Sequence, residues 1–498
     1  MTLPLYLYTA EQVKRGEVVA AQQAGIELYQ LMLRAGEATF ALLQEQYPKI
    51  AHITVVCGAG NNGGDGFVVA RLAKEAGLDV DLFLTSDATR LLGDAAQAYQ
   101  AWLTAGGRLT SFDKFETSLQ SCDVIVDGIL GTGLKGDVRA NLVSLFQTIN
   151  QANKPIVAID LPSGLCADTG RILGAAICAN HTISFIGLKQ GLVTGDARSV
   201  TGRLHFAGLE VEEKFIELYS PSAQLLDYHS VAELLPQRSP VAHKGDHGRV
   251  TCIGGNLGYS GAIRLCAQAV VRSGAGLTSA LCHSGSILPL QLACPEVMVR
   301  DWDGSKRILF ERLKRQDVVA IGPGLGMDDW AKTAVQSVVQ LQIAKVVDAD
   351  ALNLLAQSPN RDGNRVITPH PGEAARLIAV SINDIENDRY AAVKALHQRY
   401  GGVVVLKGAG TLIFDGQTVF VCAVGNAGMA SGGMGDVLTG VIAALIGQGL
   451  SISQAARLGV LVHSQAADDL VLTHGQIGLT ASDLVPQIRR LLNGLHKL

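Results

Sequence analysis

The segment Ala430–Gly440, ASGGMGDVLTG, places a single aspartate, Asp436, among glycines at the start of an apolar run. Glycine turns let backbone N–H groups converge on one point and form a site for an anion. The run VLTGVIAALIG has helical apolar spacing, so a helix beginning at about Gly435–Asp436 would add its N-terminal dipole to that site. Because a carboxylate beside phosphate is unfavourable as a ligand, we interpret Asp436 as a base that takes a proton from a hydroxyl. The alternative is an ordinary N-cap aspartate.

Three further motifs of the same kind precede this segment. KGAGT (Lys407–Thr411) follows the β-rich run VVVL and combines glycines with a cation, which suits a nucleotide phosphate or ribose. HPGEAARL (His370–Leu377) and DADALN (Asp348–Asn353) open helical stretches after ITP and KVV. Each motif alone is weak, because acidic residues are common caps at helix starts. Their succession along one part of the chain predicts a nucleotide site.

The first half of the chain carries a different set of polar loops. In CGAGNNGGDGFVVARLA (Cys57–Ala73), the GxGxxG spacing is a weak signal, but two asparagines and an aspartate inside the loop are unusual. Their oxygens could bind a cation or a nicotinamide-type head. The alternative is a glycine-rich turn in which asparagines adopt the left-handed conformation.

Further oxygen-bearing side chains follow the next strands of this half. Asp127 ends the run VIV, GTGLKGD (Gly131–Asp137) comes next, and Asp160 and Ser163 stand in IDLPSG. We expect these groups to converge at one sheet edge. A set of Asn, Asp and Ser oxygens without His or Cys favours a hard cation over zinc.

The elements that must position these residues follow one recurring pattern. Each repeat consists of a short β-rich run, a glycine-rich or acidic turn and a helical stretch. This order predicts parallel βαβ sheets. Such sheets bind their ligands at the carboxyl ends of the strands. The pattern breaks into a charged, irregular piece between Glu210 and about Pro240. We therefore expect an α/β protein of two domains, residues 1–220 and 225–498, each a three-layer αβα arrangement. A single large α/β domain is the alternative.

The composition narrows the class of protein. Of 498 residues, 48% are hydrophobic, 17% are charged and 56 are glycine, which suits buried parallel strands joined by tight turns. The net charge of −4, with both signs mixed, gives no basic face for nucleic acid. Nine cysteines without a CxxC pair predict reduced, buried thiols. With no expected signal peptide or membrane-spanning run, the sequence predicts a soluble, cytoplasmic protein.

Residues from about 240 to 490 resemble the ribokinase-like fold and specifically the ADP/ATP-dependent NAD(P)H-hydrate dehydratase family. The resemblance rests on HKGDHGRV, GYSGAIRL, GPGLG, DADALN, TPHPGEA, KGAGT and GNAGMASGGMGDVLTG. It implies an ATP- or ADP-linked removal of water from a hydrated nicotinamide ring, by phosphorylation of the hydroxyl and loss of phosphate, with Mg²⁺ bridging the phosphates. It assigns Asp436 as base, Gly433, Met434 and Gly435 as anion hole, Lys407, Gly408, Ala409, Gly410 and Thr411 to the adenine nucleotide, and Ala262, Gly324 and His370 to the hydrated dinucleotide.

Residues of about 10–218 resemble the NAD(P)H-hydrate epimerase family, whose members interconvert the R and S hydrates. The resemblance implies K⁺ ligands at Asn62, Asp127 and Ser163, and an acid/base at Asp160, for which we expect a buried setting. It assigns substrate contacts to Asn61, Asn62, Gly63, Gly64, Asp65, Gly131, Thr132, Gly133, Leu134, Lys135, Gly136 and Asp137. LMLRAGE (Leu31–Glu37), near the first helix, departs from the family pattern. The departure bears on contacts of that helix, which could belong to a dimer interface.

Together the two resemblances predict a bifunctional repair enzyme that acts on NAD(P)H hydrates with ADP or ATP. The alternative is a small-metabolite kinase of the ribokinase-like type with a fused ligand-binding module. A first unit that senses a ligand without turnover is a third possibility. By resemblance we expect a homo-oligomer, dimer or tetramer. His243 and Lys244 could contact the nucleotide or shape the first strand of the second domain, and we favour the structural role. The sequence leaves ADP against ATP, and NADH against NADPH hydrate, open.

Overall fold

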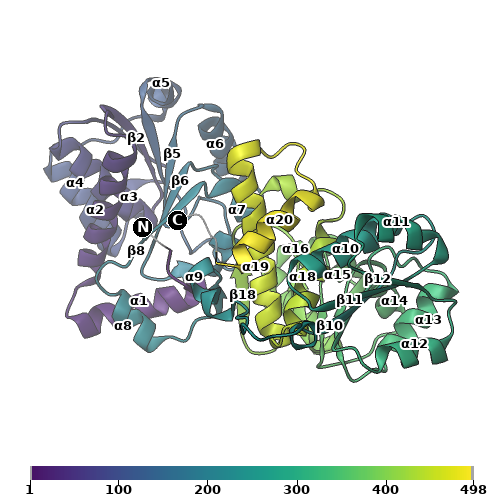
Figure 1. Ribbon diagram of the computed structural model, residues 1–498. Coiled ribbons are helices and arrows are strands. Elements are labelled where there is room, and N and C mark those ends of the chain that lie inside the picture. The colour runs from purple at the N-terminus through teal and green to yellow at the C-terminus, as the bar shows by residue number, and fades with distance from the viewer. Residues whose placement is uncertain (1–2, 495–498) are drawn as a thin grey trace. The chain divides into compact units, whose positions relative to one another are not determined.

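The computed structural model describes residues 3–494, and residues 1–2 and 495–498, at the outer ends of the two predicted domains, lie outside that range. The chain divides into two compact units, the first ending at Gln224 and the second beginning at Leu225. In the colours of Figure 1 the first unit runs from purple to teal and the second from teal to yellow. Each unit is described by itself.

The first unit is built on a six-stranded sheet in which every neighbouring pair is parallel. The strands, in spatial order, are β3 (Asp79–Leu84), β2 (His52–Cys57), β4 (Val124–Gly128), β5 (Ile156–Ile159), β6 (His181–Phe185) and β8 (Arg203–Ala207). A small ladder pairs β1 (Tyr6–Tyr8) with β7 (Leu188–Lys189) in parallel and with β9 (Ala223–Leu225) in antiparallel orientation.

Helices cover both faces of this sheet. They are α1 (Ala10–Ala24), α2 (Leu28–Gln46), α3 (Asn61–Glu75), α4 (Gly93–Thr104), α5 (Phe115–Ser121), α6 (Ala140–Gln151), α7 (Ala197–Val200) and α8 (Glu212–Leu218). Alternate strand residues belong to different cores: Val55 packs with α1–α4, whereas Val56 packs with α5 and α6. Burial on both faces explains the nearly uninterrupted apolar strands and confirms the predicted αβα layers.

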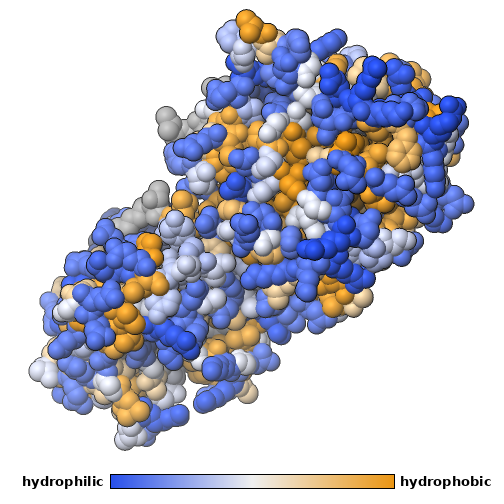
Figure 2. Space-filling model, turned by 90° about the horizontal axis from the view of Figure 1, so that it is seen from below, coloured by the Kyte–Doolittle hydropathy of each residue, from blue (hydrophilic) through white to orange (hydrophobic). Residues whose placement is uncertain are grey.

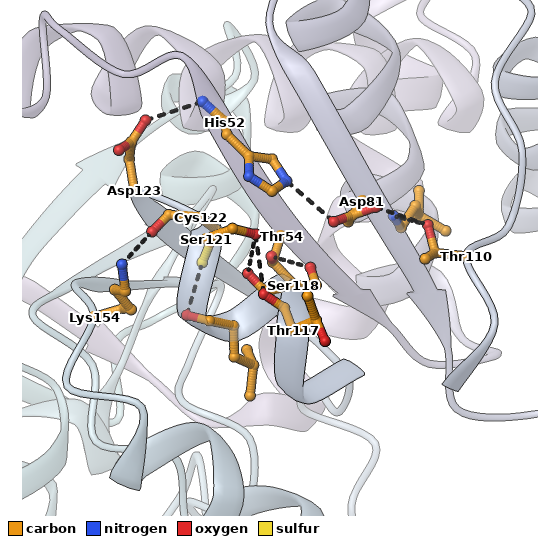
Figure 3. Close-up of polar contacts among 12 residues, drawn as sticks. His52, Thr54, Asp81, Thr110, Thr117, Ser118, Ser121, Cys122, Asp123 and Lys154 are labelled. Carbon is orange, nitrogen blue, oxygen red and sulfur yellow. Dashed lines mark hydrogen bonds and ion pairs between the residues drawn. The ribbon is translucent and has the colours of Figure 1, made fainter. Parts of the chain in front are cut away.

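The amino ends of these strands are fastened by polar contacts, as Figure 3 shows. His52, at the start of β2, lies with its Nε2 3.1 Å from Asp81 Oδ2 on β3. Asp123, just before β4, accepts a hydrogen bond from the His52 backbone N–H at 3.0 Å, and Lys154 donates to the Cys122 carbonyl at 2.7 Å. These contacts stabilise the amino ends of the strands. The polar loops lie at the opposite, carboxyl edge of the sheet and take no part in them.

The second unit is built on a nine-stranded sheet that is parallel except for its last two pairings. The strands, in spatial order, are β12 (Met298–Asp301), β11 (Leu277–Cys282), β10 (Arg249–Ile253), β13 (Val318–Ile321), β14 (Ala344–Val347), β15 (Arg365–Ile367), β16 (Val403–Leu406), β17 (Thr411–Phe414) and β18 (Val419–Cys422). The turn from β16 back into antiparallel β17 is the KGAGT loop, which is thereby held at the carboxyl edge of the parallel strands.

Two helical layers enclose this second sheet. The helices are α9 (Tyr228–Val231), α10 (Ser260–Arg272), α11 (Ile287–Ala293), α12 (Lys306–Leu313), α13 (Asp329–Val338), α14 (Ala349–Gln357), α15 (Pro371–Ile378), α16 (Ile382–Asn387), α17 (Arg389–Tyr400), α18 (Met434–Gly447), α19 (Ile452–His474) and α20 (Ala481–Leu492). Val318 and Ala320 share a core with α10, α18 and α19, while Val319 and Ile321 are buried on the other face. Helix α18 is buried nearly all round, and this fixes the position of its N-terminus.

Several sequence expectations can be compared with this fold. The strands expected from the β-rich runs are present, but the predicted irregular piece after Glu210 contains α8, β9 and α9. All nine cysteines are free, although Cys178 is exposed and Cys166 is only partly buried. No described helix is both long and apolar enough to cross a membrane. The face drawn in Figure 2 is mostly hydrophilic, with hydrophobic residues gathered in smaller patches.

Candidate active sites

The second site begins at the N-terminus of α18. Gly433 is the N-cap residue with φ 89°, a left-handed conformation that a side chain would strain, and Asp436 follows in the first turn. The first intrahelical bond is made by the Val437 N–H to the Gly433 carbonyl at 3.1 Å, so the amides of Met434, Gly435 and Asp436 precede it without intrahelical partners. The predicted convergence of amides beside Asp436 is therefore present, and the N-cap interpretation of Asp436 is wrong.

A buried ion pair lies directly beneath this turn. Lys407 Nζ, at the end of β16, donates to Asp348 Oδ1 at 2.9 Å, and Thr439 Oγ1 of α18 donates to Asp348 Oδ2 at the same distance. A Cβ added at Gly435 would lie 3.1 Å from Lys407 Nζ and 3.2 Å from Asp348 Oδ2. Asp348 occupies the N-cap position of α14 but caps nothing, because its oxygens are taken by Lys407 and Thr439.

The charges around this pair set the protonation of Asp436. Burial raises the pKa of Asp436 to about 7, and the nearby Asp348 carboxylate adds to the effect while Lys407 opposes it. Burial works against a charged Asp348 as well, but Lys407 more than offsets it and the pKa of Asp348 is lowered. A carboxylate whose pKa lies near 7 can accept a proton at neutral pH and release it again.

The neighbouring strand ends complete the site. His370 caps α15, its backbone N–H donating to Glu373 Oε2 at 2.8 Å, and Glu373 Oε2 lies 3.8 Å from Lys407 Nζ. Burial raises the pKa of Glu373. The Gly322–Gly326 turn follows β13, and a Cβ added at Gly324 would lie 3.2 Å from Ala262 Cβ on α10. Ala262 and Gly324, predicted to contact one ligand, are thus adjacent.

Three residues of the second site were not assigned from the sequence. Asp348 and Glu373 stand in the quoted motifs, but only the fold shows that they face Lys407 and are more than helix-start acids. His463 on α19 is buried, and burial lowers its pKa to about 4, so its ring is neutral. It bonds the Met434 backbone and thus supports the turn before Asp436. A histidine in an apolar helix gives no sequence signal for that contact.

The first site surrounds a cavity of about 780 Å³ at the carboxyl edge of the first sheet. Its lining includes the predicted residues Asn61, Asn62, Asp65, Gly131, Thr132, Gly133, Leu134, Lys135, Asp137 and Asp160. Gly63 and Gly64 pack instead against Gly58 and Met32, and Gly136 does not line the cavity. Gly58 makes the turn possible, since a Cβ there would lie 1.9 Å from the Ile129 carbonyl oxygen.

The three predicted cation ligands converge beneath the loop that follows β4. Ser163 Oγ donates to Asp127 Oδ1 at 2.6 Å, the Leu130 N–H donates to Ser163 Oγ at 2.8 Å, and Asn62 Nδ2 donates to the Leu130 carbonyl at 3.1 Å. Burial raises the pKa of Asp127 to about 6. Asn61 and Asn62 are the first residues of α3 and have negative φ, so the left-handed interpretation of these asparagines is wrong.

Asp160 lies at the end of β5 in the left-handed conformation, with φ 64°. Its side chain is 15% exposed at the cavity, and the ammonium of Lys189, itself 2% exposed, is paired with it. Lys189 also donates to Ser184 Oγ at 3.3 Å and to the Phe185 carbonyl at 3.1 Å. Lys189 and Glu17, both lining the cavity, were not singled out in the sequence because neither belongs to a glycine loop.

Comparison with known proteins bears on both sites. Residues 250–490 match the family model described as NAD(P)H-hydrate dehydratase, and residues 28–191 match that of the YjeF-related protein N-terminus. The bifunctional NAD(P)H-hydrate repair enzyme of Vibrio cholerae is 50% identical over 494 residues, 99% of each chain. The enzyme of that description from Escherichia coli is 47% identical over 99% of this chain and 95% of its own. This chain belongs to the bifunctional NAD(P)H-hydrate repair enzyme family.

The second unit of this repair enzyme also resembles solved structures. A crystal structure of the ADP/ATP-dependent NAD(P)H-hydrate dehydratase from Bacillus subtilis, co-crystallized with ATP/Mg²⁺, has a TM-score of 0.52 and 28% identity. It covers 56% of this chain and all of its own. A ribokinase-like superfamily protein from Enterococcus faecalis has a TM-score of 0.52 and 31% identity, over 56% of this chain and 98% of its own. The two-enzyme prediction is confirmed, and the matches do not support the small-metabolite kinase.

Proposed function

We propose that this repair enzyme clears hydrated nicotinamide dinucleotides in two steps on one chain. The first unit interconverts the R and S hydrates, and the second removes water from the S form with ADP or ATP as phosphoryl donor, giving AMP or ADP and phosphate. One observation carries the proposal: Asp436 stands beside amides at the start of α18 that have no intrahelical partner, over the Asp348–Lys407 pair. A base and an anion site side by side are what transfer of a phosphoryl group to a hydroxyl requires.

In the second unit, Asp436 takes the proton from the ring hydroxyl as the hydroxyl oxygen attacks the terminal phosphorus of the nucleotide. The amides of Gly433, Met434 and Gly435 hold the phosphoryl oxygens. The Lys407–Thr411 turn holds the adenine nucleotide, with Ala262, Gly324 and His370 on the hydrated ring's side. Phosphate is a better leaving group than hydroxide, so the C–O bond then breaks and a neighbouring C–H proton leaves to restore the ring double bond.

A K⁺ ion fits the first unit. Asn62 Oδ1 is buried and has no hydrogen-bond partner among the described residues, while the oxygens of Asp127 and Ser163 lie along the same loop. A buried amide oxygen without a donor is costly unless something positive faces it. Asn62, Asp127 and Ser163 would hold the ion, which supplies positive charge beneath the Gly131–Asp137 loop. That charge would fix the loop around the dinucleotide.

Mg²⁺ belongs to the second unit in this proposal. It would enter with the nucleotide and be held mainly by the phosphates, where it neutralises charge on the group being transferred. The protein's own contribution there is to orient the hydroxyl, hold the phosphoryl oxygens and carry the proton. A cytoplasmic location and an assembly of two or four copies remain predictions.

The test uses the full chain with a mixture of R and S hydrates. With ADP or ATP present, we expect complete return of NAD(P)H absorbance, because the epimerase feeds the dehydratase. Without nucleotide, NMR should show R and S interconverting with no NAD(P)H formed. Return of only the S fraction would contradict the epimerase step, and no return with either nucleotide would contradict the dehydratase step.

A further inference from the structure

Among the ionisable groups that line the cavity of the first unit, three carboxyl groups and one ammonium group interact with one another. Glu17 comes from α1, Asp65 from α3, Asp160 from the end of β5 and Lys189 from β7. If all four of these groups were ionised, the ammonium of Lys189, with help from Lys14 on the same wall, would face three carboxylates in a largely buried space. Burial and mutual repulsion raise the pKa values of Glu17 and Asp65, so at least one of the three carboxyl groups holds a proton near neutral pH.

The contacts of Lys189 indicate which carboxyl group is charged. Its ammonium makes its ion pair with Asp160, and Ser184 Oγ and the Phe185 carbonyl take its other hydrogen bonds. Burial raises the pKa of Glu17 to about 7; Asp160 adds to this, while Lys189 and Lys14 oppose it. Burial also raises the pKa of Asp65. The cavity is therefore lined by an ion-paired carboxylate, Asp160, and by a group with a pKa near neutrality, Glu17.

Inverting the hydrated carbon requires such a pair. Hydration of the ring's enamine bond places the hydroxyl on the carbon bonded to the ring nitrogen, which is the electrophilic carbon. To invert it, a base takes the hydroxyl proton, the C=O bond forms and the C–N bond breaks, while an acid gives a proton to the nitrogen. After rotation the nitrogen attacks the other face and both protons return, so no atoms or electrons are gained or lost.

We propose that Glu17 is the catalytic acid of epimerisation, that Asp160 is its partner base, and that Lys189 is the positioning residue that holds Asp160 charged and aimed into the cavity. This inference rests on the proposed epimerase function. Glu17 is favoured over Asp65 because a group that gives and regains a proton at neutral pH works best when it titrates there. The groups that face Glu17 are Lys14 on its own helix, Asp65 on α3, Asp160 after β5 and Lys189 on β7.

The experiment follows R-to-S exchange by NMR in the full chain without nucleotide, starting from one purified epimer and varying pH. In the wild type, activity should fall above about pH 7 as Glu17 loses its proton. Glu17→Gln should lower kcat/KM by about 10² to 10⁴-fold and remove that alkaline decline. Glu11→Gln, an exposed acid of the same helix, is the matched control and should behave as wild type.

Two further variants keep the test decisive if Glu17→Gln is poorly folded. Glu17→Asp retains an acid and should keep the alkaline decline at reduced rate. Asp65→Asn should keep the decline as well. A wild-type rate and pH profile in Glu17→Gln, or loss of the alkaline decline in Asp65→Asn instead, would overturn the assignment of Glu17. Absence of exchange in the wild type would overturn the epimerase function itself, a separate result.

Discussion

Lys407 and Asp348 form an ion pair with 2.9 Å between Nζ and Oδ1, although 59 residues separate them in the sequence. Asp348 is 2% exposed and its other oxygen accepts from Thr439, so both its oxygens are occupied. Glu373 lies 3.8 Å from the same ammonium. Lys407 is therefore anchored by carboxylates below the phosphate-binding turn, and its charge partly neutralises the acids that surround Asp436.

Removing the lysine should cost both stability and activity. Lys407→Met leaves Asp348 charged and buried without a cation beside it, and breaking such a pair costs about 3 kcal/mol. We expect denaturant unfolding of the second unit to shift by that amount and dehydration to be lost, while R-to-S exchange in the first unit continues.

A second change separates charge from packing. Asp348→Asn in the Lys407→Met background removes the unpaired charge and keeps an acceptor for Thr439, so the double variant should regain at least about half of the lost stability. A double variant no more stable than Lys407→Met would show that the pair is not the source of the loss.

In the second unit the sequence predicted which residues lie together, but it did not predict the ion pair of Asp348 with Lys407. The strand–turn–helix pattern placed Asp348, His370 and Lys407 at strand ends and Asp436 at a helix start, and parallel strands share one edge, so their gathering was predictable. The sequence could not show that Asp348 faces Lys407 rather than capping α14, because both arrangements use an acid at a helix start. That choice is made by tertiary packing, which places Lys407 after β16 and Thr439 of α18 beside Asp348.

The rate of dehydration should decline at acid pH, and the pKa of Asp436 should set the position of this acid limb. That pKa is raised to about 7, so below that pH the carboxyl group is protonated and cannot act as base. We expect kcat/KM to fall about tenfold per pH unit below pH 7 and to level off above it. The measurement is initial rate of NAD(P)H return from the pure S hydrate against pH.

The position of that limb should respond to nearby charge. Asp350 is one of the carboxylates that raise the pKa of Asp436, so Asp350→Asn should move the limb to lower pH. Asp329→Asn, on an exposed acid at the start of α13, is the control and should leave it in place. An unchanged limb in Asp350→Asn would argue that another group titrates.

The two activities should separate by single substitutions. Asp436→Asn keeps the size of the side chain but cannot accept the proton, so dehydration should fall by about 10² to 10⁴-fold with exchange intact. Asp160→Asn should do the reverse. Loss of both activities from either change would contradict two independent sites.

In the first unit the sequence predicted where the polar loops lie, but it did not predict the ion pair of Asp160. Asn62, Asp127 and Ser163 were expected at one sheet edge and are joined there through Leu130. The ion pair of Asp160 with Lys189 was not foreseen, since Lys189 sits in the two-residue strand β7, which follows β6 through a short turn and has no motif. Its effect on Asp160 depends on burial, which spacing does not reveal.

Potassium should stabilise the first unit through Asn62. Its Oδ1 is buried without a hydrogen-bond partner in the described chain, and a bound cation would satisfy it. At K⁺ about tenfold above its Kd, the first unit should gain about 1.4 kcal/mol over the same ionic strength of a large organic cation. Asn62→Ala removes the oxygen, so it should abolish this gain in stability and slow R-to-S exchange. Asn62→Asp keeps an oxygen and should still respond to K⁺.

Both Asn62 variants lose the hydrogen bond from Nδ2 to the Leu130 carbonyl, so a difference between them isolates the effect of the cation. Thermal unfolding with and without K⁺ measures it, and an equal K⁺ response in Asn62→Ala and wild type would contradict the site.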